Sequence, residues 1–189
     1  MRAALANGMN RIALGAAALV AGALVFVQSP ASAQSPRFRW ELGAAGGPLV
    51  IDGGVGGVGG LHTQLGIQLG SIPALYYTGI FGGGAGVGNG GYFQYNTVAF
   101  EVTLLHTFQF ALGPSIDIIR VGYGSSAGAD RGYGVYLGAM ARIGLAIGGH
   151  GRDRRGGLLL GIEIHPTFAT DERFTAPTAL MFTIGGGQY

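Results

Sequence analysis

Hydrophobic and polar residues alternate with a period of two along most of the chain after residue 36. Phe38, Trp40 and Leu42, for example, alternate with Arg39 and Glu41. This period is typical of a β-strand with one apolar and one polar face, because successive side chains point to opposite faces. The pattern recurs over residues 37–42, 64–69, 75–81, 98–104, 108–118, 135–147, 158–165 and 179–184. We therefore predict eight strands, an even number as single-chain bacterial membrane barrels require.

The segments between these strands are rich in glycine and other turn residues. Long stretches at 45–60, 82–91, 123–132 and 169–177 alternate with short connections at 71–73 and 106–107, and only 148–156 departs from this order. Membrane barrels have long external loops at one end and short periplasmic turns at the other. The predicted fold is therefore all-β, an eight-stranded antiparallel up-and-down transmembrane β-barrel.

The two faces of the predicted strands differ in size and charge. One face carries bulky apolar residues, whereas glycine, alanine, serine, threonine and the charged residues occupy the other. The lumen of eight strands only just accommodates side chains, and an arginine facing lipid at mid-depth costs about 2–4 kcal/mol. We expect the charged face to line the lumen as a network of paired charges, with a proton or ion path as the alternative. The candidate network residues are Arg37, Arg39, Glu41, Glu101, Asp117, Arg142, Glu163 and His165.

Aromatic residues gather near the predicted strand ends, where membrane barrels carry aromatic girdles. Packing between loops is the alternative interpretation. These residues are Trp40, Tyr76, Tyr77, Tyr92, Tyr95, Tyr123, Tyr133 and Phe168.

The first 33 residues have the features of a secretory signal peptide. Two arginines, Arg2 and Arg11, precede an apolar run of 16 residues at 12–27, and Ala31 and Ala33 form a small-x-small cleavage site. The run is shorter than the ~20 residues of a spanning helix. We predict a cleaved signal peptide over 1–33 and one barrel domain over 34–189, with an uncleaved membrane anchor as the alternative.

The charge balance follows from this cleavage. The whole chain has 11 Lys+Arg and 9 Asp+Glu, and two of the arginines lie in the predicted signal peptide, which leaves nine against nine. The basic isoelectric point thus gives no indication of a nucleic-acid partner.

The sequence gives little support for a nucleotide-binding or a metal-binding site. The 86–91 stretch matches G-x-G-x-x-G, but an aromatic strand follows it and not a helix, so a dinucleotide site is not expected. The chain has no cysteine, and its four histidines lack i, i+4 spacing, so no metal site is expected. We predict no cofactor.

The signal peptide, the eight alternating strands and the terminal aromatic Tyr189 together resemble small outer-membrane β-barrels. These are the OmpA-type transmembrane domain and the OmpX-like and opacity-protein-like barrels. The resemblance implies an outer-membrane location, with membrane lipid and the barrel-assembly machinery as partners. In these families, apolar residues alternate with the terminal aromatic. Here Phe182 and Ile184 are out of phase with Tyr189.

The resulting hypothesis is a non-enzymatic outer-membrane barrel with a packed polar interior, acting in envelope structure or surface interaction. Three alternatives remain open at this point. They are a narrow pore, a lipid-modifying enzyme that uses Glu163, His165 and Thr167, and a soluble exported barrel that binds an apolar ligand.

Overall fold

The computed structural model describes residues 36–51, 54–86, 89–123, 131–150, 155–168 and 177–188. The predicted signal peptide with Ala31 and Ala33, and the terminal Tyr189, lie outside these residues. Among the residues described, no helix is long and apolar enough to cross a membrane. The strands are β1 (Arg37–Ile51), β2 (Gly54–Gln68), β3 (Pro73–Gly86), β4 (Asn89–Leu104), β5 (Phe108–Tyr123), β6 (Arg131–His150), β7 (Arg155–Phe168) and β8 (Thr178–Gln188).

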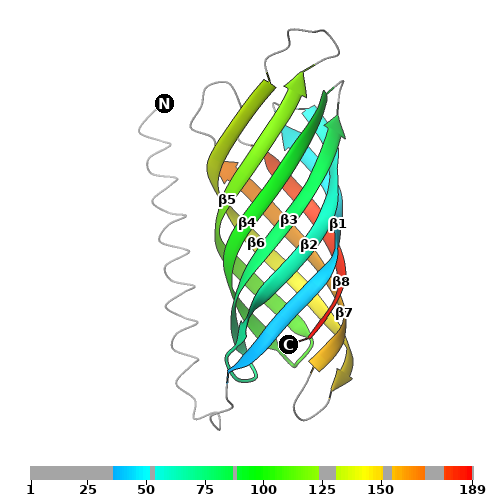
Figure 1. Cartoon of the computed structure of the whole chain (residues 1–189). Coiled ribbons are helices and arrows are strands. Elements are labelled where there is room, and N and C mark those ends of the chain that lie inside the picture. The colour runs from blue at the N-terminus through cyan, green and yellow to red at the C-terminus, as the bar shows by residue number, and fades with distance from the viewer. Residues whose placement is uncertain are drawn as a thin grey trace, which may run out of the picture. The chain divides into compact units, whose positions relative to one another are not determined.

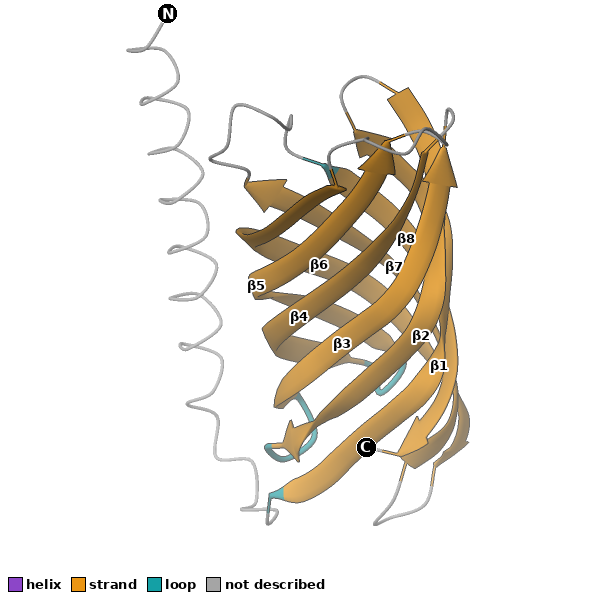
Figure 2. Ribbon diagram, turned by 45° about the horizontal axis from the view of Figure 1, so that its top comes forward, coloured by secondary structure: helices purple, strands orange, loops and turns teal. Residues whose placement is uncertain are grey.

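The eight strands form a single closed barrel. Each strand pairs antiparallel with its neighbour in sequence, and β1 pairs with β8 to complete the ring (Figure 1). Figure 2 shows the strands inclined around one lumen as a wall one strand thick. Closure leaves no strand edge unpaired, which removes the usual site of edge-to-edge aggregation. The prediction of an all-β, eight-stranded antiparallel up-and-down barrel is confirmed.

The two ends of the barrel carry different connections. At one end, which we call the short-turn end, residues 69–72 and 105–107 connect β2 to β3 and β4 to β5. The latter is a type I′ turn, because Leu105 and His106 have φ angles of 51° and 58° and the Thr107 amide donates to the Leu104 carbonyl at 3.0 Å. The opposite end, the loop end, carries the connections after β1, β3, β5 and β7.

Two predicted long loops are wrong. Most of 45–60 belongs to β1 and β2, which pair as far as Ile51 and Gly54. Most of 82–91 belongs to β3 and β4, which pair as far as Gly86 and Asn89. The 148–156 connection is shorter as well, because β6 continues to residue 150 and β7 begins at residue 155.

Glycine permits this pairing where the barrel wall is tight. Gly60 of β2 and Gly82 of β3 are register partners on the lumen side. A Cβ atom at Gly60 would lie 2.2 Å from the Phe81 carbonyl oxygen, and one at Gly82 would lie 2.1 Å from the Gly59 carbonyl oxygen. These glycines therefore allow the two strands to pair closely, and they do not mark a flexible loop.

The outer face is apolar, as the alternation predicts. Leu137, Phe38 and Ile143, for example, are 69%, 66% and 59% exposed. Of the predicted girdle residues, Trp40, Tyr92 and Phe168 lie on this face.

Two predicted girdle residues, Tyr76 and Tyr95, lie elsewhere. They are 2% and 1% exposed and point into the lumen, so the girdle prediction is wrong for both. Each occupies an inward position of its strand, and the face of the strand decides where a side chain lies regardless of its nearness to a strand end.

The lumen is filled in two layers. Charged and polar side chains occupy its middle and the part towards the short-turn end, together with smaller apolar groups such as Ala146 and Leu159. A second group of apolar side chains packs near the loop end, within five residues of the strand ends in β1, β2, β4 and β5. Bulky apolar residues thus share an interior that we expected to contain mainly small and polar ones. We call this group the loop-end apolar cluster: Leu49, Val58, Ile80, Phe93, Ile119 and Met181.

Candidate functional site

The acidic residues and two of the arginines of the described strands lie inside the barrel. The inward residues that we predicted come from β1, β4, β5, β6 and β7, and each is at most 2% exposed. They are Arg39, Glu41, Glu101, Asp117, Arg142, Glu163 and His165. Arg37 is the first residue of β1, where it is half-buried on the strand face that it shares with Arg39.

Arg39 and Glu101 form the tightest ion pair of the cluster. Both terminal guanidinium nitrogens face the carboxylate: Nη1 donates to Oε1, and Nη2 donates to Oε2 at 2.9 Å. Nη2 also donates to Gln64 Oε1 at 3.1 Å, and the guanidinium lies 4.7 Å from the centre of the Tyr76 ring. A bidentate arginine–carboxylate pair is both strong and directional. This pair therefore fixes β1 against β4 across the lumen.

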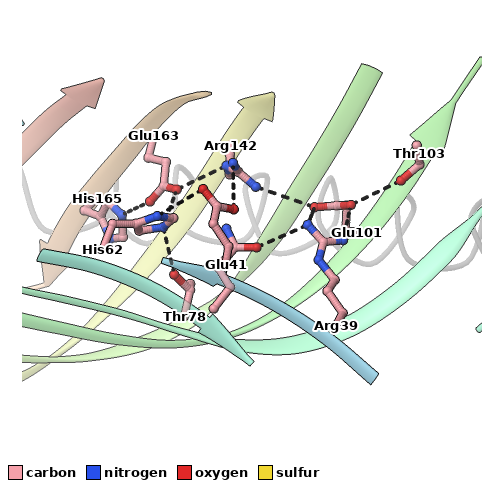
Figure 3. A network of polar contacts seen from close by, with 10 residues as sticks. Arg39, Glu41, His62, Thr78, Glu101, Thr103, Arg142, Glu163 and His165 are labelled. Atoms are coloured by element: carbon pink, nitrogen blue, oxygen red, sulfur yellow. Dashed lines mark hydrogen bonds and ion pairs between the residues drawn. The ribbon is translucent and has the colours of Figure 1, made fainter. Parts of the chain in front are cut away.

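Arg142 is the centre of the cluster. Figure 3 shows it between three glutamates that come from three other strands. Its Nε lies 3.2 Å from Glu163 Oε1, its Nη2 lies 3.4 Å from Glu41 Oε2, and its Nη1 lies 3.7 Å from Glu101 Oε2. Because one guanidinium touches all three carboxylates, Arg142 joins the Arg39–Glu101 pair to the remainder of the network.

His62 connects two of these glutamates. Its Nδ1 lies 3.4 Å from Glu41 Oε1, and its Nε2 lies 3.2 Å from Glu163 Oε1 and 3.2 Å from Thr78 Oγ1. A neutral imidazole can donate from only one nitrogen, whereas the imidazolium donates from both. The two facing carboxylates therefore fit a doubly protonated His62.

The charge count agrees with that geometry. Arg39 and Arg142 contribute two positive charges, and Glu41, Glu101 and Glu163 contribute three negative ones. For these five ion-paired residues the sum is −1 with neutral histidines, and one imidazolium makes it zero. Asp117, which accepts from the Thr167 hydroxyl, is not part of this count. Because unpaired buried charges are costly, such a balance suits the ion-paired residues of a closed lumen.

His165, Glu163 and Thr167 do not assemble as a hydrolytic site. His165 Nε2 lies 3.0 Å from Glu163 Oε2, and its ring packs 4.8 Å from that of Tyr95. The Thr167 hydroxyl donates to Asp117 Oδ2 at 2.6 Å. A hydrolase needs its nucleophile in contact with the base, whereas here the threonine hydroxyl and the imidazole have different partners.

No group of three or more potential metal-ligating side chains is found among the residues that the structure describes. The polar atoms of the cluster instead bind one another, as Thr103 shows by donating to Glu101 Oε1 at 3.2 Å. This arrangement can balance buried charges inside the barrel and can link strands that are not neighbours in the sheet.

Four residues that were not predicted from the sequence also take part in the network: His62, Gln64, Thr78 and Thr103. Strand phase could have identified them. His62 is in phase with Gln64 on the inward face of β2, but the predicted strand begins only at residue 64, whereas β2 begins at Gly54.

No family model matches the chain, and no curated protein is similar to it in sequence. Its fold is similar to that of several solved structures. The attachment invasion locus protein Ail of Yersinia pestis is 11% identical, with 82% of this chain and 99% of that chain covered and a TM-score of 0.50. Neisserial surface protein A is 11% identical, with 82% and 97% covered and a TM-score of 0.48. The outer membrane protein OprG of Pseudomonas aeruginosa is 8% identical, with 83% and 97% covered and a TM-score of 0.48. The expected resemblance to small outer-membrane barrels is thus confirmed at the level of the fold.

Proposed function

We propose that this chain is a non-enzymatic β-barrel of a Gram-negative outer membrane, with a packed interior and a role in envelope structure or surface interaction. One observation carries the proposal: the barrel is inverted relative to a soluble protein. The described acidic residues all lie inside, at most 2% exposed, while most of the large apolar residues lie outside.

The apolar residues of the outer surface are suited to contact with the acyl chains of a membrane. Soluble monomers rarely expose a contiguous apolar patch above a few hundred Å², yet here apolar residues on every strand are exposed. The strands are between 11 and 20 residues long, and a tilted strand crosses a bilayer in about 9–11 residues. Each strand is therefore long enough to span.

A packed lumen favours a structural role over a pore. Arg39 and Glu101 are inaccessible to solvent, and Arg142 is 2% exposed. Above them, Phe93 and Ile119 of the loop-end apolar cluster are 3% and 5% exposed. An ion would have to displace both layers, and eight strands enclose little space beyond their own side chains.

The other two alternatives have less support. The partners of His165 and Thr167 disfavour a hydrolase, because each is bonded to a different carboxylate and neither is accessible. The described hollow at the loop end, between Ile51, Ile119 and Tyr136, has a volume of about 10 Å³. Pockets for small ligands measure about 300–1,000 Å³, so this one does not favour an apolar ligand.

Export and insertion complete the proposal. Cleavage after Ala33 releases the chain beyond the inner membrane, the barrel-assembly machinery inserts it, and outer-membrane lipid surrounds it. The short-turn end then faces the periplasm and the loop end faces outward, as in other such barrels.

Membrane fractionation with unboiled gel electrophoresis tests the location. The protein is expected in the outer-membrane fraction, with a mobility that changes on heating. Trp40 gives a second measurement, because it is the single tryptophan and is 41% exposed on the outer face. Its fluorescence should be quenched by lipids with brominated acyl chains. A protein that stays soluble in the periplasm, with no heat-dependent shift and no quenching, would refute the proposal.

A further inference from the structure

A chain of polar side chains crosses the outer face of β3 and β4. The Tyr77 hydroxyl donates to Asn96 Oδ1 at 2.8 Å, and Gln94 Nε2 donates to the same oxygen at 2.9 Å. The Tyr92 hydroxyl donates to Gln94 Oε1 at 3.1 Å, and Asn96 Nδ2 donates to the Ile116 carbonyl at 3.1 Å. We call these four residues, together with Arg120 of β5, the outer polar strip: Tyr77, Gln94, Asn96, Tyr92 and Arg120. Arg120 is the register partner of Tyr92.

A glycine makes room for the strip. Gly79 lies between Tyr77 and Phe81 on the outer side of β3. A Cβ atom there would lie 2.8 Å from the Tyr77 hydroxyl and 2.7 Å from the Phe81 ring. With no side chain at this position, the Tyr77 ring can lean along the strand until its hydroxyl reaches Asn96. The backbone thus accommodates the hydrogen-bonded arrangement.

The strip begins within the height of a membrane. The outward positions of β4 from Leu104 to Val98 are apolar, and Asn96 is eight residues from Leu104. A rise of ~3.3 Å per residue and a tilt of about 40° place Asn96 roughly 20 Å and Gln94 roughly 25 Å above Leu104. The apolar belt of a membrane barrel is about 25 Å tall. The strip therefore lies where acyl chains meet headgroups.

The neighbouring outer positions of β5 are apolar at this height: Ile116 is 52% exposed and Ile118 is partly exposed. Polar groups in hydrocarbon are costly unless they are bonded. The internal bonds of the strip offset part of that cost. Each amide group has two N–H donors, and Gln94 and Asn96 each use one of them in the described structure. The strip can therefore both donate to and accept from a ligand.

Arg120 supplies the charge at the top of the strip. It points outward and is exposed, and it forms no ion pair with any residue that the structure describes. Every described acidic residue lies in the lumen instead. The described face of a second copy of this chain would thus offer Arg120 no carboxylate. A lipid phosphate would pair with it directly, since a guanidinium binds phosphate with two parallel hydrogen bonds.

We propose that the outer polar strip binds a phosphorylated glycolipid of the leaflet at the loop end. Arg120 contacts the phosphate, Tyr92, Gln94 and Asn96 contact the sugar hydroxyls and the amide or ester linkages, and the acyl chains lie along Val98 and Ile116. This site depends on the proposed membrane location.

Native mass spectrometry of the protein folded in detergent measures the binding of lipid A and so tests the site. Bisphosphorylated lipid A, its dephosphorylated form and phosphatidylglycerol are the probes. Loss of two uncharged hydrogen bonds in Gln94→Leu/Asn96→Leu should weaken lipid A binding about tenfold or more. Arg120→Gln should abolish the preference for the bisphosphorylated form. Thr178→Leu, another outward polar position near the loop end, is the matched control and should bind as the unaltered protein does.

Two results would overturn the site. One is equal lipid A binding by the unaltered protein and both strip variants, all shown to be folded by their heat-dependent gel shift. The other is a dimer that Gln94→Leu/Asn96→Leu abolishes without changing lipid A binding, which would assign the strip to a second copy. Failure of the membrane location itself is recognised separately, by a protein that is soluble without detergent and shows no gel shift.

Discussion

Replacing the Arg39–Glu101 ion pair tests how the charged lumen contributes to stability. In Arg39→Met, the polar contacts left to Glu101 within the described part of the chain are Arg142 Nη1 at 3.7 Å and the Thr103 hydroxyl at 3.2 Å. Removing one partner of a buried pair costs about 3–5 kcal/mol, and the remaining contacts favour the lower part of this range. Loss of the guanidinium over Tyr76 adds about 1 kcal/mol. We expect a loss of about 4 kcal/mol.

The double variant Arg39→Met/Glu101→Met should be far less affected. Apolar side chains of similar volume can replace a buried pair at little cost, because both desolvation penalties disappear with the charges. We expect the free energy of unfolding of the double variant to lie within about 1 kcal/mol of that of the unaltered protein. The double-mutant cycle then gives a coupling energy between Arg39 and Glu101 of about 3 kcal/mol or more.

Denaturant unfolding in lipid vesicles measures these differences, with the fraction folded determined from Trp40 fluorescence and from unboiled gels. Glu101→Met completes the cycle and should also be strongly destabilised. A double variant as unstable as Arg39→Met, or a loss of less than about 1 kcal/mol in Arg39→Met, would refute this role of the ion pair.

Three further predictions concern the wall and one turn. Ile143→Arg, on the outer face, should cost about 2–4 kcal/mol in vesicles relative to Ile143→Leu, and equal stabilities in the same unfolding assay would argue against a lipid-facing surface. Gly82→Ala should destabilise the barrel strongly, because its Cβ atom would lie 2.1 Å from a carbonyl oxygen. Gly57→Ala is the control and should be tolerated, because its Cβ atom would have nothing within 4 Å. The unfolding midpoints of the two variants are compared, and equal midpoints would contradict the prediction. Leu105→Asn/His106→Gly should stabilise the type I′ turn by about 1 kcal/mol, because these residues adopt positive φ more readily, and an unchanged midpoint would contradict this.

The number and orientation of the strands follow from local pattern. Alternation suffices where bulky and small residues face opposite environments, as in Phe38 to Leu42. It fails where glycine removes the contrast. Residues 45–60 have few side chains to alternate, yet backbone hydrogen bonds form the same ladder without them.

The membership of the interior cluster follows from strand phase, but its pairing does not. Arg39 pairs with Glu101 from β4, which is not a neighbouring strand. Such contacts depend on the register of every intervening pair and on the size of the lumen, and a single sequence contains neither explicitly. Phe93 shows the same limit: its inward position could be assigned only once β4 was known to begin at Asn89.

The ion pairs of the lumen also determine when stability is gained during folding. Arg39 and Glu101 are 62 residues apart, and Arg142 and Glu41 are 101 apart. No single hairpin contains both members of either pair, so an incomplete sheet carries these charges without their partners. Such distant contacts are slow to form, because the entropy of closing the intervening chain must be lost first. We expect partly assembled barrels to be poorly populated, and the meeting of β1 with β8 to be the step that commits the chain to its native state.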